Sequence, residues 1–181
     1  MAVSPSIILC DQRPDIVRAW MSAFAAFPEV DVREGDLLDV ESDAYVSPAN
    51  SYGIMDGGID YILRERFINI EERVQTAISD IGLSLPVGLA VVVETHDLDV
   101  PYLICAPTMV TPSYVGSSRN AFLAMSALLS AVDEFNEETG DVISSIGIPG
   151  LCTGIGAMDP MDSAVQMAQA YADWSERRTD A

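Results

Sequence analysis

The sequence predicts an α/β protein, a three-layer α/β/α sandwich around a mixed, mainly parallel central sheet. Short β-branched runs alternate along the chain with segments whose apolar residues recur at helical spacing, which is typical of a parallel sheet covered by helices. Two glycine-rich loops each follow a strand-like run and precede a helix-like one. This order places both loops at the edge of the sheet where open α/β folds bind ligands.

The first half of the chain contains three predicted strands and three predicted helices. The strands are residues 6–10 (SIILC), 30–34 (VDVRE) and 43–47 (DAYVS). A helix is expected from Pro14, with apolar residues at helical spacing through Phe24 and Phe27, and Pro28 ends it. Two more helices are expected over residues 59–67 (IDYILRERF) and 71–82, the second closed by Gly82 as a glycine cap.

The second half begins with two strands, residues 89–95 and 101–106, that are separated only by the polar turn HDLD. So short a connection predicts an antiparallel hairpin, which makes the sheet mixed. A long helix over residues 118–138, a last strand over 142–149 and a final helix over 161–177 follow.

The bulk composition indicates one soluble globular domain over residues 1–181, which we expect in the cytoplasm. Hydrophobic residues make up 49% of the chain, but no apolar run is long enough to span a membrane. The chain has 28 acidic and 9 basic residues, all of the latter arginine, and a net charge of −19. Because affinity for phosphodiester backbones comes mainly from basic side chains, polymeric nucleic acid is not expected as a partner. The charge indicates either an ordinary acidic surface or adaptation to high salt.

Cysteine and histidine give no catalytic or metal-binding pattern. Cys10, Cys105 and Cys152 are far apart in or beside apolar runs, so they are interpreted as buried packing residues. His96, which is unique in the chain, precedes a turn, where a surface position is expected. No metal site and no cofactor are predicted.

The two glycine-rich loops are the candidate binding elements. They are residues 47–60 (SPANSYGIMDGGID) and 150–160 (GLCTGIGAMDP). Glycine lets a ligand approach backbone N–H groups closely, and the N–H groups before a helix have no internal partner. Two such loops facing each other would hold a pyrophosphate without Lys or Arg. The alternative is that the glycines only form turns. Neither loop has the pattern of a Walker A motif or a GxGxxG fingerprint.

Six segments in order resemble the macro domain, an ADP-ribose-binding α/β/α module: GDLL (35–38), DAYVSPANS (43–51), DGGID (56–60), PVGLAVVVE (86–94), PYLICAP (101–107) and IGIPGLCTGIG (146–156). The resemblance covers residues 31 to 175 and leaves residues 1–30 outside as an extra strand and helix. We expect the strand at 6–10 to take the sheet position of a C-terminal strand that many macro domains possess.

The resemblance implies a role for each matching position. Asp36 would accept a hydrogen bond from the adenine amino group beside Leu37. Asn50 would bind the distal ribose and orient the reaction, and Asp60, with Asp56, would supply carboxylates that activate water. The remaining residues implied to line the ligand are Ala49, Gly57, Gly58, Ile59, Cys152, Thr153, Gly154, Ile155 and Gly156.

Each polar residue also has a structural interpretation. Asp36 would start a turn or cap a helix, Asn50 would hold its own loop through an Asx turn, and Asp60 would complement the helix dipole. Some positions depart from the family pattern. Asp56 would repel a terminal phosphate monoester, Ser47 and Pro48 replace the usual Asn and Ala, and Ala157 and Met158 stand where an aromatic ring usually covers the distal ribose.

Three functions remain open on the sequence. The first is an enzyme that removes ADP-ribose from proteins or from O-acetyl-ADP-ribose through Asn50 and Asp60. The second is a module that binds ADP-ribose or a related nucleotide without turnover. The third is an interaction protein that retains only the fold.

Overall fold

The structure is a computed structural model that describes residues 4–140 and 142–180, so residues 1–3, 141 and 181 of the predicted domain lie outside the described residues. Its strands are β1 (Ser6–Asp11), β2 (Asp31–Glu34), β3 (Ala44–Ser47), β4 (Val91–Glu94), β5 (Tyr102–Cys105) and β6 (Ser145–Ile148). Its helices are α1 (Pro14–Ala23), the 3₁₀ turn η1 (Leu37–Asp39), α2 (Gly58–Arg66), α3 (Ile70–Ile81), α4 (Asn120–Thr139) and α5 (Pro160–Asp180).

The strands form one six-stranded sheet in the order β2-β1-β6-β3-β5-β4. Every neighbouring pair is parallel except β4 and β5, which form the antiparallel hairpin that the short turn predicts. The sheet is therefore mixed and mainly parallel, as the sequence predicts. β1, from the N-terminal segment, lies inside the sheet between β2 and β6.

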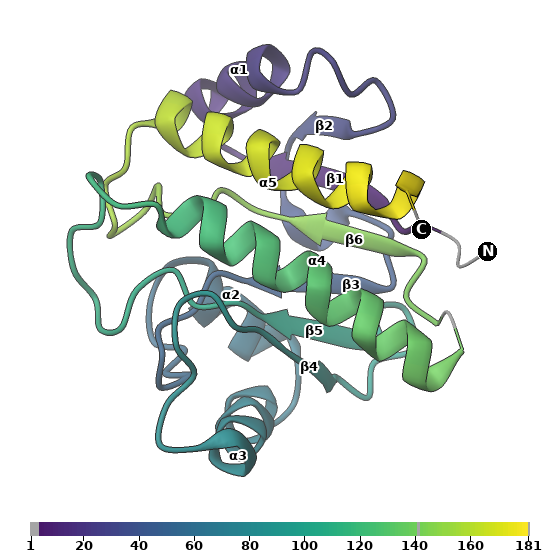
Figure 1. Ribbon diagram of the computed structural model, residues 1–181. Helices are drawn as coiled ribbons and strands as arrows, with labels where there is room; N and C mark the ends of the chain where they lie inside the picture. The colour runs from purple at the N-terminus through teal and green to yellow at the C-terminus, as the bar shows by residue number, and fades with distance from the viewer. Residues whose placement is uncertain (1–3, 141, 181) are drawn as a thin grey trace.

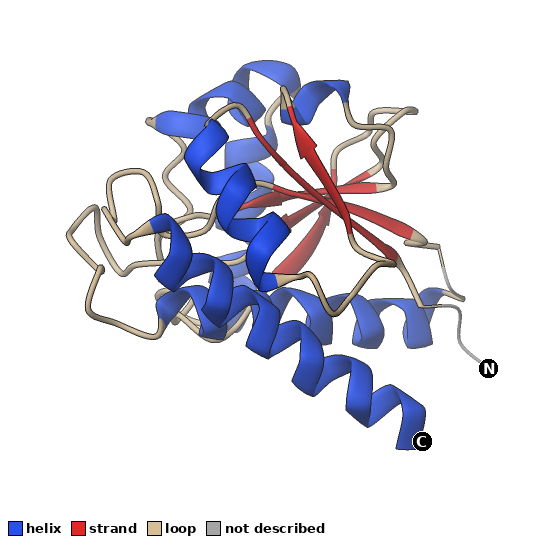
Figure 2. Cartoon of the chain, turned by 90° about the horizontal axis from the view of Figure 1, so that it is seen from above, coloured by secondary structure: helices blue, strands red, loops and turns tan. Residues whose placement is uncertain are grey.

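Helices cover both faces of this sheet (Figures 1 and 2). Successive residues of a strand point to opposite faces, so Leu9 packs in one core and Ile8 and Cys10 in the other. The first core contains α1, α4 and α5, of which α4 and α5 pass in front of the sheet in Figure 1. The second core contains α2, α3 and η1. This arrangement confirms the predicted three-layer α/β/α sandwich.

The direction of the strands decides where the site lies. β1, β2, β3, β5 and β6 are parallel, so their carboxyl ends meet at one edge of the sheet. The segments that follow these five strands are brought together there, although they lie far apart in the sequence. None of the helices in residues 4–140 and 142–180 is long and apolar enough to cross a membrane.

Two helix boundaries differ from the prediction. α1 ends at Ala23 rather than near Pro28. Because Pro28 has no N–H to donate to the Phe24 carbonyl, this carbonyl accepts the Phe27 N–H at 2.8 Å in a tighter turn. Phe24 and Phe27 still pack against Tyr171 of α5, so their apolar spacing reflects burial beyond the helix itself. α3 ends at Ile81, and Gly82 follows it as the cap residue, but with φ 168°, an extended conformation, and not the left-handed one of a glycine cap.

Candidate active site

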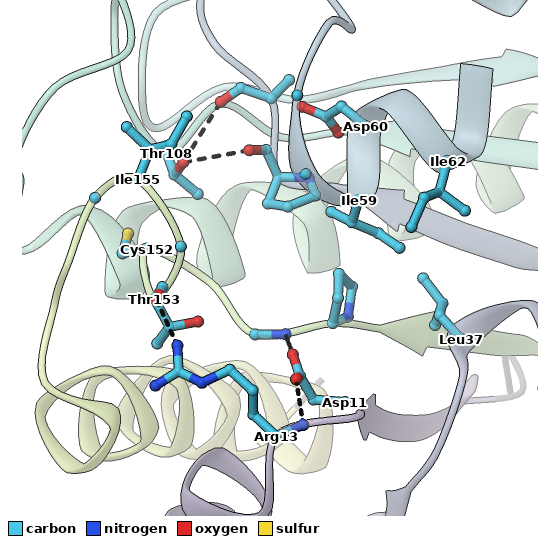
Figure 3. A pocket seen from close by; sticks show the side chains of 18 of the residues that line it. Asp11, Arg13, Leu37, Ile59, Asp60, Ile62, Thr108, Cys152, Thr153 and Ile155 are labelled. Carbon is cyan, nitrogen blue, oxygen red and sulfur yellow. Dashed lines mark hydrogen bonds between the residues drawn. The ribbon is translucent and has the colours of Figure 1, made fainter. Parts of the chain in front are cut away.

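The candidate site is a cavity of about 340 Å³ at the carboxyl edge of the parallel strands. Figure 3 shows this cavity from close by. It is lined by the segments that follow β1, β2, β3, β5 and β6. Every residue implied by the family resemblance lies on its wall: Asp36, Leu37, Ala49, Asn50, Asp56, Gly57, Gly58, Ile59, Asp60, Cys152, Thr153, Gly154, Ile155 and Gly156. The two glycine-rich loops therefore converge on one cavity.

The first glycine-rich loop, residues 47–60, runs from the end of β3 into α2. Gly57 caps the helix in an extended conformation, and Gly58 has φ 57°, a left-handed conformation that glycine adopts without strain. Within the described residues, no protein acceptor receives the N–H groups of Gly57, Gly58, Ile59 and Asp60. These donors lie at the positive end of the helix dipole, so this end of α2 favours an anion.

The second glycine-rich loop, residues 150–160, directs its carbonyl groups toward the protein. The carbonyl oxygens of Cys152, Gly154 and Gly156 accept bonds of 2.9–3.0 Å from the backbone N–H groups of Met158, Ala157 and Val115. No acceptor within the described residues receives the N–H groups of Gly154, Ile155 and Gly156. The loop thus presents a second set of donors.

The geometry of this second loop requires glycine at one position and corrects one expectation. A Cβ at position 156 would lie 2.7 Å from the Cys152 carbonyl oxygen. The sequence predicts that the donors of this loop belong to the first turn of the following helix. In the structure they do not. α5 begins only at Pro160, and the Asp159 carboxylate caps it by accepting the N–H groups of Met161 and Asp162.

Asp60 lies in the first turn of α2 and lines the cavity with only 8% of its surface exposed. Its Oδ1 accepts a 2.6 Å hydrogen bond from the hydroxyl of Ser47. Burial raises the pKa of Asp60 to about 6, and the nearby Asp56 carboxylate adds to this, while the bond from Ser47 opposes it. A carboxyl group with such a pKa exchanges protons near neutral pH, as a general base does.

Asn50 holds the first loop in shape. Its Oδ1 accepts the N–H groups of Tyr52 and Ile54 at 3.0 and 3.3 Å, and its Nδ2 donates to the Ile54 carbonyl at 2.8 Å. This is the Asx turn that the structural interpretation expected. One Nδ2 hydrogen remains for a ligand.

Asp36 and Leu37 lie at the end of the cavity that follows β2. Oδ1 of Asp36 accepts the Leu38 N–H at 2.9 Å and caps η1, while Oδ2 accepts 3.2 Å from the Gln12 side chain. The capping role is therefore present. Because a carboxylate has about four acceptor positions, Asp36 retains capacity for a ligand.

Several residues of the cavity wall were not predicted from the sequence. Residues 11–13 line it, although the N-terminal segment was placed outside the family resemblance. Thr108, after β5, joins the loops: its N–H donates to the Ala49 carbonyl at 2.9 Å, and its hydroxyl contacts the Pro48 carbonyl at 3.3 Å. The place of the strand at 6–10 within the parallel sheet could have indicated residues 11–13, because a parallel strand brings the segment that follows it to the same edge of the sheet. The other missed residues are Cys10, Ile16, Gly35, Ile54, Ile62, Met109, Pro112, Pro149 and Gly150.

The three cysteines are free and buried, as predicted, and burial raises the pKa of each thiol. A raised pKa leaves little thiolate for nucleophilic chemistry. His96 is exposed in the β4–β5 turn. Within residues 4–140 and 142–180, no group of three or more His, Cys, Asp or Glu side chains is placed to hold a metal ion.

Most of the chain matches one known protein family. The family model described as the Macro domain matches residues 46–168. The chain belongs to the macro domain family. This match begins within β3, so β1, α1 and β2 of this macro domain precede it.

Curated relatives and solved structures agree with this assignment. An uncharacterized protein of Aeropyrum pernix is 33% identical over 141 residues, which cover 77% of this chain and 68% of that protein. A macro domain-containing protein of Listeria monocytogenes is 27% identical over 153 residues and 84% of each chain.

Among solved structures, the macrodomain of Mycobacterium tuberculosis DarG has a TM-score of 0.65 at 24% identity, over 78% of this chain and 88% of that one. Thermosipho africanus DarTG in complex with ADP-ribose has a TM-score of 0.61 at 16% identity, over 77% of this chain and 37% of that one. At these identities the structures show that the fold is shared.

Proposed function

We propose that this macro domain binds ADP-ribose or a related ADP-ribosyl nucleotide between its two glycine-rich loops, and hydrolyses an ADP-ribosyl linkage with Asp60 as general base. The observation that carries the binding proposal is the convergence of two sets of N–H donors, from Gly57 to Asp60 and from Gly154 to Gly156, on one cavity. Such donors suit a diphosphate in a chain that has no lysine.

Structures with a similar fold support the choice of ligand. The Thermosipho africanus protein was solved in complex with ADP-ribose, and a variant of the Oceanobacillus iheyensis macrodomain was solved with ADPR. In the present chain, the acceptor Asp36 and the apolar Leu37 suit an adenine at the end of the cavity that follows β2. Asn50 and Asp60, on the β3 side, suit the distal ribose and the linkage attached to it.

The proposed hydrolysis uses a water molecule beside Asp60. The ionised Asp60 accepts a proton from this water while the water oxygen forms a bond to C1″ of the distal ribose. The bond from C1″ to the modified group breaks, and its electron pair leaves with that group, which takes up a proton from the solvent. The neighbouring diphosphate, held by the loops, lies close to the positive charge that develops on the ribose.

Calorimetric titration with ADP-ribose tests binding. The proposal expects one site with measurable heat at micromolar to millimolar ligand. No heat at millimolar ADP-ribose would contradict binding and would leave the interaction protein as the remaining hypothesis.

Turnover separates an enzyme from a binding module. Release of ADP-ribose from a modified protein and from O-acetyl-ADP-ribose would be compared between the wild type and Asp60→Asn, which keeps the side-chain shape but cannot accept the proton. The proposal expects loss of turnover with binding retained. Equal turnover would remove Asp60 as the base, and no turnover in either protein would favour the binding module.

A further inference from the structure

We infer that Arg13 is a positioning residue for the second glycine-rich loop, and that its hydrogen bond to the Thr153 carbonyl turns the Gly154 N–H toward the ligand. The inference rests on the proposed function, because it assigns this N–H to the bound diphosphate. Arg13 lies before the segment that matches the family model. Among the described residues that line the cavity, it is the one basic residue.

The guanidinium of Arg13 contacts the loop directly. Its Nη1 donates to the Thr153 carbonyl at 2.8 Å, as Figure 3 shows. The rest of the guanidinium is held by Asp15, with Nε 3.2 Å from Oδ1 and Nη2 2.6 Å from Oδ2. The bidentate pair with Asp15 fixes the plane of the guanidinium and leaves Nη1 directed at the loop.

The backbone of Arg13 is tied to the same loop through Asp11. Oδ1 of Asp11 accepts the Arg13 N–H at 2.9 Å, and Oδ2 accepts the Gly150 N–H at 3.1 Å. Position 150 is closely packed, since a Cβ there would lie 2.5 Å from the Thr153 hydroxyl oxygen and 3.0 Å from Oδ2 of Asp11. Residues 11–13 therefore hold the loop at its start, through Gly150, and near its centre, through Thr153.

The geometry of the peptide unit transmits this contact to the donor. The Thr153 carbonyl and the Gly154 N–H belong to one planar trans peptide, so they point in opposite directions. A carbonyl drawn toward Arg13 therefore turns the Gly154 N–H away from Arg13. Gly154 is exposed on the cavity wall, and no acceptor within the described residues receives its N–H.

Arg13 donates to the Thr153 carbonyl, which accepts no backbone N–H from residues 4–140 and 142–180. The neighbouring carbonyls of Cys152 and Gly154 are fixed by backbone N–H groups. Gly154 and Gly156 flank Ile155 and have no side chain, so the backbone between the fixed carbonyls is less restricted in its rotation. The Asp15 carboxylate balances the charge of Arg13. The hydrogen bonds of the guanidinium go to Asp15 and to the Thr153 carbonyl. The geometry therefore assigns Arg13 to the loop and not to the diphosphate.

The test compares Arg13→Ala and Arg13→Lys with Arg18→Ala. Arg18 is an exposed arginine on α1 outside the cavity wall, so its removal makes the same change in net charge. Affinity for ADP-ribose would be measured by calorimetry and thermal stability by scanning calorimetry. We expect Arg13→Ala to bind about tenfold more weakly than Arg18→Ala, with Arg13→Lys between them, because the lysine ammonium can still donate to the carbonyl.

Amide NMR supplies a readout that a general loss of stability would not move. At saturating ADP-ribose, the Gly154 amide proton should shift downfield in the wild type and much less in Arg13→Ala, while Gly58 shifts in both. In the free protein, Arg13→Ala should lower the order parameter of Gly154 and leave that of Gly58 unchanged.

Two results would overturn the inference: affinity of Arg13→Ala within twofold of Arg18→Ala, or an unchanged Gly154 shift and order parameter in Arg13→Ala. A direct contact between Arg13 and the diphosphate would leave the Gly154 shift intact, so it would also count against the inference. If the wild type does not bind ADP-ribose, the proposed function fails as well, and the free-protein order parameters then show separately whether Arg13 holds the loop.

Discussion

The hydroxyl of Ser47, the last residue of β3, donates a 2.6 Å hydrogen bond to the carboxylate of Asp60, in the first turn of α2. Both side chains are almost completely buried. This bond is the specific stabilisation of the Asp60 charge, and it opposes the larger effect of burial, which raises the pKa of Asp60 to about 6. Protonation of Asp60 therefore affects both the stability of the folded protein and the proposed hydrolysis.

We predict that Asp60→Asn stabilises the protein above pH 6. A carboxyl group whose pKa is higher in the folded than in the unfolded state contributes stability that is complete below pH 3.8 and is lost as the pH rises through about 6. Asparagine does not ionise, so the variant should be more stable than the wild type by up to roughly 3 kcal/mol at pH 8. Urea unfolding from pH 4 to 8 measures this, and a difference that stays constant with pH would be inconsistent with it.

We predict that hydrolysis requires ionised Asp60. Turnover at low substrate should rise with pH and level off above about pH 6, and Asp60→Asn should lose roughly 100-fold or more. Ser47→Ala should shift the midpoint to higher pH, because it removes the donor that favours the charged form. Initial rates across pH 4.5–8.5 check this. The same midpoint in Ser47→Ala and the wild type would rule out the Ser47 effect.

We predict that Gly57→Val weakens ADP-ribose binding at least tenfold and lowers the free energy of unfolding by only about 1 kcal/mol, the cost of a poorer N-cap residue. Gly57 has φ −151° and ψ 156°, which valine adopts readily, and a Cβ there meets no atom within 4 Å. The new side chain instead occupies the approach of a ligand to the N–H groups of α2. The control is Gly58→Ala, which should cost about 1 kcal/mol of folding free energy because of its positive φ. Unchanged affinity in Gly57→Val would place the ligand elsewhere.

We predict that Asn50→Ala destabilises the fold by roughly 1–3 kcal/mol, because it removes three hydrogen bonds of the Asx turn. Asn50→Asp keeps an acceptor for Tyr52 and Ile54 but loses the donor to the Ile54 carbonyl. It should therefore fall between the wild type and the alanine variant in chemical unfolding. Full stability in Asn50→Ala would show that the loop is held by other contacts.

We predict that a terminal phosphate on the distal ribose weakens binding. Asp56 is exposed on the cavity wall, and its carboxylate would repel a phosphate monoester. Asp56→Asn should narrow the difference in affinity between ADP-ribose and ADP-ribose 1″-phosphate, and high salt should narrow it in the wild type. If neither change narrows the difference in affinity, the discrimination against the phosphate arises from the shape of the cavity and not from the charge of Asp56.

The sequence predicted the sheet, its hairpin and the convergence of the glycine-rich loops, because strand periodicity and the order of elements are local signals with direct consequences for topology. It did not predict the place of Arg13 in the cavity wall, since this depends on β1 pairing with β6, about 140 positions away in the chain. It also placed the donors of the second loop at a helix start. In the structure they arise from contacts between Met158, Ala157 and the loop carbonyls, which spacing alone does not reveal.

A crystal structure of the protein with ADP-ribose would show whether the two loops bind the diphosphate. We expect the diphosphate between the two loops, with its oxygens within hydrogen-bond distance of the Gly58 and Gly154 amides and the distal ribose beside Asp60. Ligand bound outside this cavity, or a diphosphate held by side chains with both amides unoccupied, would contradict it.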